Sequence, residues 1–396
     1  MSGSQIGDDA LRALDIFQIE IPSWGFANTG TRFGKFVQPA AATSLEEKFA
    51  DASQVHALTG VTPQLALHVL WDIPGGVGDV AQVRRLADRY GIRPGSTNPN
   101  LFQNQEYKLG SICNPESAIR QMAIDHLVES VRIAKELKSA DVSLWIADGS
   151  NYPGSQNIRR RIVWLEEALA ATHAELGEGQ RMLIEYKPFE PAFYHTDIAD
   201  WGMAAQLAQA AGPKSRVLVD TGHHYQSQNI EQIVAWLLHL RLLGGFHFND
   251  RRYGDDDLTI GSIDPYQVFR IFHEIFSEPD MSLISEIAFM IDQSHNLKGK
   301  VEAMVQTVMT AQELYLKAVL VDRQRLEELQ TAGKIVEAEE CLRAAFWTDV
   351  RPALAEWRIR RGLHPNPLEA LKESGYVERI TRERRAKNSA LTTSYA

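Results

Sequence analysis

The chain has 396 residues, of which 44% are hydrophobic and 23% are charged, a composition typical of a globular protein that buries a large core. Its 41 basic and 51 acidic residues leave a net charge of −10, which argues against a nucleic-acid partner because affinity for phosphates comes from lysine and arginine. No apolar run approaches the ~20 residues that a membrane span needs and the N-terminus lacks a secretory signal, so we expect a cytoplasmic protein with no membrane partner.

Short apolar runs alternate with helical patterns along most of the chain. The runs are near-continuously apolar, as expected for strands that are buried on both faces. Eight candidate strands lie, in chain order, in FQIEIPSW from Phe17, LALHVLW from Leu65, YGIRPGST from Tyr90, VSLWIADG from Val142, MLIEYKP from Met182, RVLVDTG from Arg216, LGGFHFND from Leu243 and the stretch AFMIDQS that ends at Ser294. The third has the weakest pattern.

Helical patterns separate the candidate strands. The pattern that begins at Ser44 opens with a capping box made of Ser44 and Glu47. The segment from Glu116 to Ala140 carries apolar residues at helical spacing, and similar patterns follow each later strand. This alternation predicts an α/β fold, a (β/α)8 TIM barrel formed by residues 1–321.

The composition changes after about residue 322. Segments such as RQRLEELQTAGKIVEAEECLRAAFW and PALAEWRIRRGL are helical in pattern and rich in arginine and glutamate, with no strand beside them. We interpret residues 322–396 as a C-terminal helical extension that packs on the barrel or on a neighbouring subunit. The polar last stretch, RERRAKNSALTTSYA, is expected to be loosely held.

Four later candidate strands each have an acid or a histidine at or near their ends. These residues are Glu185, Asp220, His247 and Asp292. In a TIM barrel the C-terminal ends of the strands share one mouth, and carboxylate oxygens with one imidazole suit Mn²⁺, Mg²⁺ or Co²⁺. A single strand-end aspartate is more often a helix cap, but four on successive strands predict a divalent metal site.

A second set of ligand-type residues is interleaved with the first. His223 lies in the loop that follows Asp220, and Asp255 and Asp257 are two residues apart in YGDDDL. If that segment is extended, both aspartates point the same way and Asp256 points away. With His223 they would bind a second ion and leave coordination positions open for substrate oxygens. A solvated acidic loop is the alternative, and the EF-hand pattern is not met.

Three further residues near strand ends are candidates for substrate contacts. His68 ends the second strand, where a histidine satisfied in the core is the commoner case, and Trp145 on the fourth would offer a sugar an apolar wall. Lys187 follows Glu185 on the same side of the fifth strand and, if buried, needs an anionic partner or a substrate oxygen. No GxGxxG, P-loop or GxSxG motif is present, so nucleotide binding and serine hydrolysis are not indicated.

Several blocks together resemble L-rhamnose isomerases, most closely the bacterial type with a relaxed aldose range: IPSWGFANTGTRFGKF, ALHVLWD, LWIADGSN, VDTGHH, GGFHFNDRRYGDDDL and MIDQSHN. The resemblance runs from about Ile19 into the C-terminal helices. Tyr186 and Ala147 depart from the pattern, where histidine and glycine are expected. The resemblance implies a barrel of the xylose isomerase-like superfamily, a homotetramer, and two divalent ions per subunit, Mn²⁺ foremost, with Co²⁺, Mg²⁺ or Zn²⁺ as alternatives.

The resemblance also implies roles for individual residues. The structural ion would be held by Glu185, Asp220, His247 and Asp292, and the catalytic ion by His223, Asp255 and Asp257. The sugar would be lined by His68, Trp71, Trp145 and Lys187, and by Phe33 from a neighbouring subunit. Catalytic roles would fall to His223, Asp255, Asp257, Asp292, Ser294 and Lys187.

These features predict a metal-dependent aldose–ketose isomerase that interconverts L-rhamnose and L-rhamnulose, with other aldoses as further substrates. Two ions that polarise sugar oxygens suit a hydride shift between C1 and C2. A metal-bound water near Asp292 and Ser294 instead suits proton transfer through an enediol, and the sequence does not choose between them. A xylose-type isomerase for another aldose, a metal-dependent TIM-barrel hydrolase and a non-catalytic sugar-binding protein are the alternatives.

Overall fold

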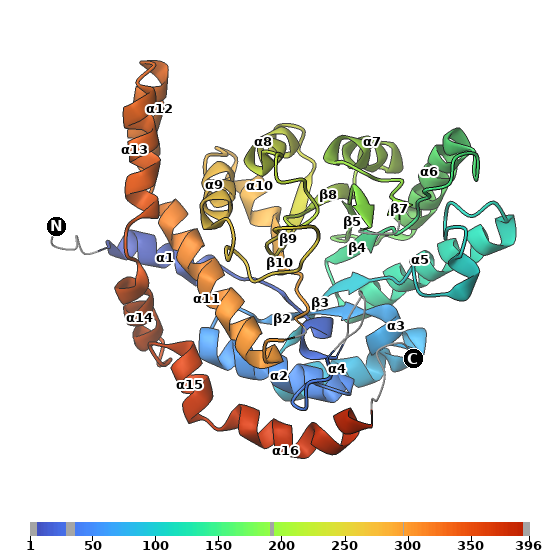
Figure 1. Ribbon diagram of the computed structural model, residues 1–396, viewed down its shortest axis with the longest axis horizontal. Coiled ribbons are helices and arrows are strands. Elements are labelled where there is room, and N and C mark those ends of the chain that lie inside the picture. The colour runs from blue at the N-terminus through green and yellow to red at the C-terminus, as the bar shows by residue number, and fades with distance from the viewer. Residues whose placement is uncertain (1–5, 29–35, 191–193, 296, 391–396) are drawn as a thin grey trace.

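Eight parallel strands form one sheet that curls into a nearly closed barrel surrounded by helices (Figure 1). The structure is a computed structural model that describes residues 6–28, 36–190, 194–295 and 297–390. In sheet order the strands are β1 (Ile21–Pro22), β2 (Gln64–His68), β3 (Arg93–Asn98), β4 (Asp141–Trp145), β5 (Arg181–Glu185), β8 (Ser215–Asp220), β9 (Leu243–Phe248) and β10 (Ala288–Ile291). The predicted TIM barrel is confirmed, and the third strand forms despite its weak pattern.

Helices between successive strands cover the outside of the barrel. The Ser44 side chain accepts the Glu47 N–H at 3.3 Å and begins the first of them, whereas the Glu47 carboxylate bonds to the N–H of Thr43 rather than of Ser44. The helices up to the end of the barrel are α1 (Asp8–Ile16), α2 (Leu45–Thr59), α3 (Val69–Asp72), α4 (Val80–Tyr90), α5 (Ser117–Leu137), α6 (Ile158–Glu175), α7 (Trp201–Ala211), α8 (Ile230–His239), α9 (Pro265–Phe276), α10 (Met281–Glu286) and α11 (Lys300–Val319). None of the helices in the described ranges is long and apolar enough to cross a membrane.

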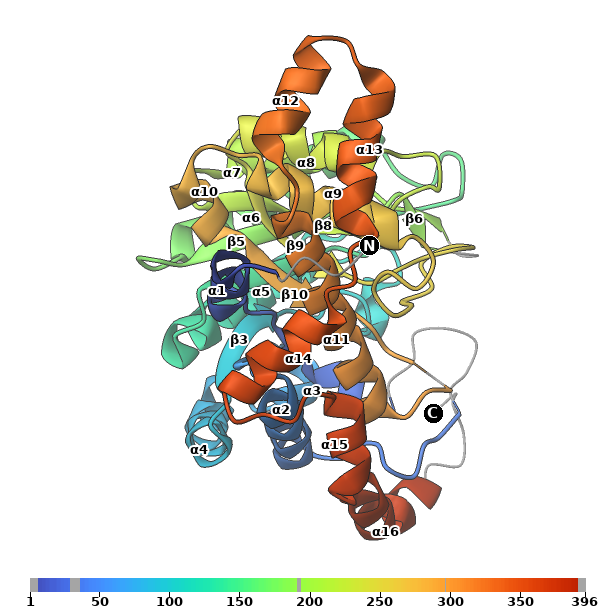
Figure 2. The same cartoon turned by 90° about the vertical axis from the view of Figure 1, so that its left-hand side faces the viewer.

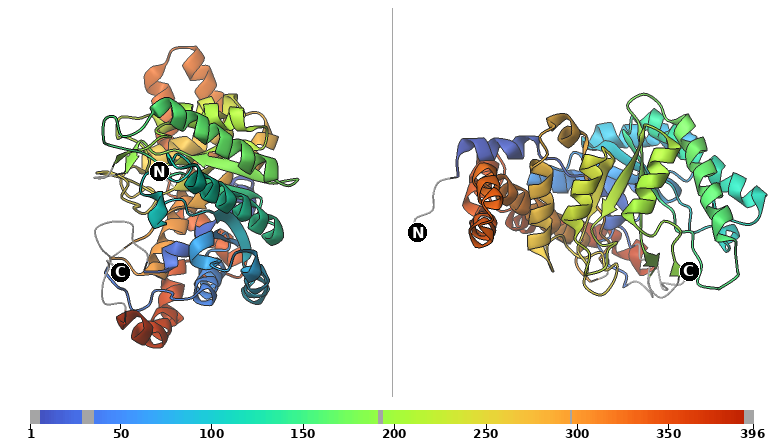
Figure 3. Two further views of the ribbon diagram at one scale, coloured as in Figure 1. Left: turned by 90° about the vertical axis from the view of Figure 1, so that its right-hand side faces the viewer. Right: turned by 90° about the horizontal axis from the view of Figure 1, so that it is seen from above.

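Five more helices follow the barrel: α12 (Arg323–Thr331), α13 (Ile335–Phe346), α14 (Arg351–Arg360), α15 (Pro367–Glu373) and α16 (Tyr376–Ser389). The α12–α13 hairpin projects from the barrel, while α14 to α16 run along its side (Figures 1 and 2). On the opposite flank α5 and α6 pack side by side (Figure 3). The predicted helical extension is therefore present, and its packing against a neighbouring subunit stays a prediction.

The last helix, α16, is held more firmly than its composition indicates. Arg384 on α16 is buried and pairs with the buried Asp51 of α2 at 2.8 Å, and the Tyr376 hydroxyl donates to the same carboxylate at 2.7 Å. Asn388 is also buried and donates to the carbonyl oxygen of Ala41 at 2.9 Å. The prediction of a loose last stretch is thus wrong as far as the end of α16, because these long-range polar bonds fix the helix.

Side chains alternate along each strand, and this alternation sends the polar strand ends into the barrel. A small apolar cluster fills the interior, separate from the large core between the sheet and the helices. The cluster consists of Leu183, Leu218 and Met290. Two residues further along β5, β8 and β10 lie Glu185, Asp220 and Asp292, and His247 pairs in register with Asp220 and Met290. The four predicted ligands therefore share the interior face.

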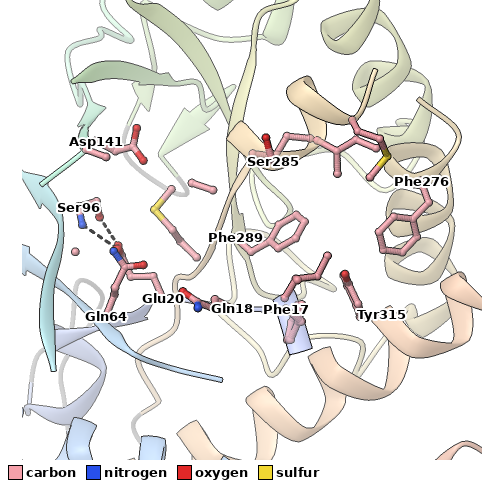
Figure 4. Close-up of a pocket in the computed structure, with 18 residues that line it drawn as sticks. Phe17, Gln18, Glu20, Gln64, Ser96, Asp141, Phe276, Ser285, Phe289 and Tyr315 are labelled. Atoms are coloured by element: carbon pink, nitrogen blue, oxygen red, sulfur yellow. Dashed lines mark hydrogen bonds between the residues drawn. The ribbon is translucent and has the colours of Figure 1, made fainter. Parts of the chain in front are cut away.

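The barrel closes through the backbone of Glu20, next to the very short first strand. The Glu20 N–H donates to the Phe289 carbonyl at 2.8 Å, and the Ile291 N–H donates to the Glu20 carbonyl at 2.9 Å. The Glu20 side chain turns inward, accepts the Ser96 N–H at 2.8 Å and occupies the space over Gly95, where a Cβ would lie 2.0 Å from its Oε2. This carboxyl borders a cavity at the N-terminal ends of the strands, opposite the aromatic side of that cavity (Figure 4).

We expect the variant Glu20→Gln to change how stability depends on pH. Burial raises the pKa of Glu20 from 4.5 to about 7, so the unfolded chain ionises before the folded one and wild-type stability falls as the pH rises between these values. From pH 5 to pH 8 the wild type should lose roughly 2 kcal/mol of unfolding free energy that the variant keeps. Urea unfolding at both pH values measures the difference, with the exposed Glu327→Gln as control. Identical pH dependence in Glu20→Gln and wild type would contradict this account.

Candidate functional site

The C-terminal ends of β5, β8, β9 and β10 bring together the four-residue cluster of Glu185, Asp220, His247 and Asp292. One potential ligand atom from each lies within 4.8 Å of all the others; three of the residues are buried and Asp292 is half-buried. His247 Nδ1 is 3.3 Å from Glu185 Oε2 and 3.9 Å from Asp292 Oδ2, and it has no hydrogen-bond partner among the described residues. Three carboxylates and an unsatisfied imidazole nitrogen are a donor set for a divalent cation.

Burial and mutual repulsion shape the electrostatics of the four-residue cluster. Burial raises the pKa of Asp220 and of Asp292, and the neighbouring carboxylate of Glu185 raises both further. Burial alone would lower the pKa of His247, but the carboxylates of Glu185, Asp292 and Asp220 together outweigh it and raise that pKa above its ordinary value. Without an ion, a proton on the imidazole supplies part of the positive charge that these carboxylates need.

His223 lies beside the four-residue cluster with its ring held in one orientation. Nδ1 is 3.1 Å from the backbone oxygen of Tyr186, so this nitrogen carries the proton that the carbonyl accepts. Nε2 then faces two carboxylates, at 3.6 Å from Asp255 Oδ2 and 3.8 Å from Asp220 Oδ2. This is the orientation in which an imidazole presents a free nitrogen to a metal, with its other nitrogen fixed by a backbone oxygen.

The three-residue group of His223, Asp255 and Asp257 is less compact than the four-residue cluster. Asp257 has a φ of 49°, so the expectation of an extended segment is wrong. The reason is Asp256, whose carboxylate turns back to accept the N–H groups of Arg252 and Tyr253 at 2.6 and 2.8 Å. Asp255 and Asp257 nevertheless both line a cavity at the C-terminal mouth of the barrel, which also holds residues of the four-residue cluster. The ligand atoms of the three-residue group do not all lie within 4.8 Å of one another.

Lys187 reaches the same cavity from the end of β5. Its side chain is 5% exposed, and Nζ donates to Asp255 Oδ2 at 2.7 Å and to Glu190 Oε2. Burial would lower the Lys187 pKa, but the two carboxylates outweigh it and raise that pKa. The expected anionic partner is therefore present, and the amine acts as a charged donor, 5.1 Å from the ring centre of Trp145.

Aromatic rings form a second part of the cavity wall. The His68 ring stacks on Trp71 with centroids 3.7 Å apart, and Phe102 packs against Trp145 at 4.9 Å. Burial lowers the pKa of His68 to about 3, so the imidazole is neutral. His68 Nδ1 and Trp145 Nε1 are buried without a hydrogen-bond partner in the described part of the chain. An apolar wall with two unsatisfied polar atoms suits a ligand that carries both C–H faces and hydroxyl groups.

The structure thus brings nearly all predicted site residues to one cavity. Its lining includes Glu185, Lys187, His223, His247, Asp255, Asp257, Asp292, Ser294, His68, Trp71 and Trp145. Asp220 is fully buried beneath the lining. Phe33 lies outside the described residues.

Several residues of the lining were not predicted, among them Trp24 and Glu190, and the strand-end rule would have found Trp24. Trp24 follows β1, and its indole N–H donates to Asp292 Oδ1 at 2.8 Å. Glu190 lies on β6 (Phe189–Glu190), which forms a hairpin with β7 (Tyr194–His195). No pattern in the sequence marks Glu190, because its position depends on the hairpin.

A buried polar network holds the aromatic wall in place. The Asp72 carboxylate accepts hydrogen bonds from the Ser23 hydroxyl, the Lys48 amine and the His68 N–H, at 2.5, 2.6 and 2.8 Å. Lys48 comes from α2 and Ser23 precedes Trp24. The network therefore fixes the segment after β1 relative to the end of β2, which sets the position of His68.

A second group with metal-ligand chemistry, Cys113, Asp148 and Asp197, has its carboxylates satisfied within the protein. Asp148 accepts the N–H groups of Ser111 and Cys113 at 2.6 and 2.7 Å. Asp197 is paired with the buried Arg161. These bonds give both carboxylates a structural role, Asp148 in the loop after β4 and Asp197 in the loop after β7.

Comparison with known proteins places this geometry among sugar-converting barrels. Residues 64–285 match the family described as "Xylose isomerase-like TIM barrel". The chain is 39% identical over 385 residues to a "Probable sugar isomerase" of Rhizobium meliloti (strain 1021), covering 96% of this chain and 89% of that protein. It is 23% identical over 310 residues to the L-rhamnose isomerase of Bacteroides thetaiotaomicron, covering 75% of this chain and 72% of that protein. Its fold is similar to that of a D-allulose 3-epimerase from Methylomonas sp., with a TM-score of 0.54 and 12% sequence identity. The match covers 76% of this chain and 97% of that one.

Removing the charge of Lys187 tests the electrostatic description of the cavity. In Lys187→Met the buried carboxylates of Asp255 and Glu190 lose their shared cation, so we expect a loss of about 3 kcal/mol or more in unfolding free energy without added metal. Urea unfolding measures the loss. Arg351→Met removes one partner of an exposed pair with Asp349 and should cost less than about 1 kcal/mol. A Lys187→Met variant as stable as wild type would contradict the description.

Proposed function

The chain belongs to the xylose isomerase-like TIM barrel family, and from that premise we propose that it is a metal-dependent aldose–ketose isomerase. Its relatives named as sugar isomerases support an isomerase-type enzyme that acts on a small sugar. The observation that carries the proposal is the four-residue cluster, set at the mouth of the barrel beside an aromatic wall. A cation site and a sugar-sized apolar surface are the two elements that this chemistry requires.

The donor sets fit two divalent ions. The four-residue cluster would hold one, since its carboxylates and His247 Nδ1 face a common point. The three-residue group would hold the second and, being less compact, leaves positions for sugar oxygens. Oxygen-rich sets with imidazole suit Mn²⁺ best, with Co²⁺, Mg²⁺ and Zn²⁺ as alternatives. Bound there, such ions polarise adjacent sugar oxygens.

The residues of the cavity supply binding, orientation and a dry environment. Isomerisation moves one hydrogen between C1 and C2 and one proton between their oxygens. Charged Lys187 donates to a sugar oxygen near Asp255, and neutral His68 offers Nδ1 to a hydroxyl at the other side. Trp71 and Trp145 cover the C–H face and exclude water. Asp292 and Ser294, which both line the cavity, would pass the proton between the two oxygens, a step that a hydride shift and an enediol route both need.

We propose L-rhamnose and L-rhamnulose as the principal pair, with other aldoses as further substrates. The sequence blocks shared with L-rhamnose isomerases and the relative of that name in Bacteroides thetaiotaomicron support this choice. The aromatic wall is also suited to a 6-deoxy sugar, whose methyl group gains from apolar contact. A homotetramer in which Phe33 reaches a neighbouring cavity rests on the sequence resemblance alone.

Chelation tests the proposed function. We expect EDTA treatment and desalting to abolish conversion of L-rhamnose in an aldose panel, and Mn²⁺ or Co²⁺ to restore it. In Glu185→Gln a neutral amide replaces one carboxylate of the four-residue cluster, so turnover with added Mn²⁺ should fall on the order of 100-fold or more.

Glu20→Gln is the matched control, because it makes the same substitution at the other mouth of the barrel and should keep its activity. Product analysis separates a C1–C2 isomerase from a C3 epimerase of the same fold. Turnover that survives chelation unchanged, or an aldose panel with no ketose product, would contradict the proposal.

A further inference from the structure

The residue after Glu185 contacts both histidines of the DTGHH block. Tyr186 is 1% exposed, and its backbone oxygen lies 3.1 Å from His223 Nδ1. Its hydroxyl oxygen lies 2.6 Å from His224 Nε2, with the two rings nearly perpendicular at 88°. A single residue at the end of β5 therefore holds two consecutive side chains of the loop that follows β8.

The same loop is held from its other side by Arg251. This buried guanidinium donates to the backbone oxygens of His224, Thr221 and Tyr225 at 2.6, 3.0 and 3.1 Å. Gly222 is packed so closely that a Cβ there would lie 2.6 Å from the side-chain oxygen of Asn249. The loop carbonyls thus face Arg251 while the His224 ring faces Tyr186, and this fixes the backbone on both sides of His223.

The orientation of His223 depends on the contacts that Tyr186 and Arg251 make with this loop. Its Nε2 faces Asp255 and Asp220 while Nδ1 lies against the Tyr186 carbonyl and 3.3 Å from Glu185 Oε1. That carbonyl is present whatever side chain occupies position 186, so the specific contribution of the tyrosine is its bond to His224. His224 is buried, and the Tyr186 hydroxyl is the partner of its Nε2. Losing the hydroxyl would leave this buried nitrogen unsatisfied and favour a shift of the loop.

We infer that Tyr186 is a positioning residue for the second metal site. Through its hydrogen bond to His224 it holds the loop so that His223 Nε2 faces the space between Asp255 and Asp220. The inference rests on the proposed function, and in particular on the second ion at the three-residue group. We expect Tyr186 to affect the second metal site and not the four-residue cluster. Within the described part of the chain its hydroxyl bonds to His224 and its backbone oxygen to His223, not to those four side chains.

The substitution Tyr186→Phe removes only the hydroxyl and is the direct test. Metal-free wild type and variant are titrated calorimetrically with Mn²⁺, which reports both affinities in the same folded protein. We expect two binding events in the wild type. In the variant the event assigned to the three-residue group should weaken about tenfold or more, as loss of a residue that orients a ligand does, and the other should change less than about twofold. Tyr315→Phe, a buried tyrosine among aromatic rings, is the matched control and should change neither.

A double variant tests whether Tyr186 acts through His224. If it does, Tyr186→Phe combined with His224→Leu should bind the second ion no more weakly than the weaker single variant, because both remove the same bond. Fold-changes that multiply would overturn the inference, since the hydroxyl would then act independently of His224. The variant Asp257→Asn identifies which binding event belongs to the three-residue group, because it should weaken the same event that Tyr186→Phe weakens.

The outcomes separate this inference from the proposed function. A wild type that binds two ions, with both affinities unchanged in Tyr186→Phe, overturns the positioning role and leaves the isomerase proposal standing. A wild type that binds a single ion overturns the second site in the proposed function, and the inference with it. Weakening of both events to the same extent in Tyr186→Phe also overturns the inference, because it would indicate a general loss of structure.

Discussion

The crowding of negative charge at one mouth of the barrel is the constraint on which the rest of the site depends. The carboxylates of Glu185, Asp255 and Asp292 line one cavity, and that of Asp220 is buried beneath its lining. Two unit charges 4 Å apart repel by about 4 kcal/mol at an effective dielectric constant of 20, so the fold must supply positive charge. Protonated His247 and charged Lys187 do so in the metal-free chain. A divalent ion would take over that role and release protons, because a ligating imidazole must be neutral on the bound nitrogen.

The ligands are held in place by hydrogen bonds from neighbouring residues. Asn249 donates to Asp220 at 3.0 Å and the Gly222 N–H donates to the same oxygen at 2.6 Å. The Trp24 indole orients Asp292, and the Tyr186 carbonyl orients His223. Each of these donors or acceptors comes from a strand end or from the first residues after it. The rigid part of the barrel thus sets the geometry of the ligands. It also supplies most of the wall, since His68 and Trp145 end β2 and β4.

The strand-end ligands could be predicted because two periodicities act together. Strand–helix repetition gives the shared mouth, and alternation within a strand gives the shared face, so Glu185 and Asp220 follow from sequence alone. The conformation of Asp257 could not, because it depends on how the Asp256 carboxylate folds back on its own loop. The place of Glu190 in the cavity and the buried ion pair of Arg384 with Asp51 could not be predicted either. In both cases tertiary packing brings together residues that no local sequence pattern links.

The central claim is that the ends of β5, β8, β9 and β10 form a divalent-cation site. Diffraction from crystals of the protein grown with Mn²⁺, collected at the manganese absorption edge, tests it most directly. The account predicts an anomalous peak bounded by Glu185, Asp220, His247 and Asp292, at roughly 2.2 Å from their oxygen and nitrogen atoms. A second peak is expected beside His223 and Asp255. Anomalous density confined to the protein surface, with none in this cavity, would contradict the account.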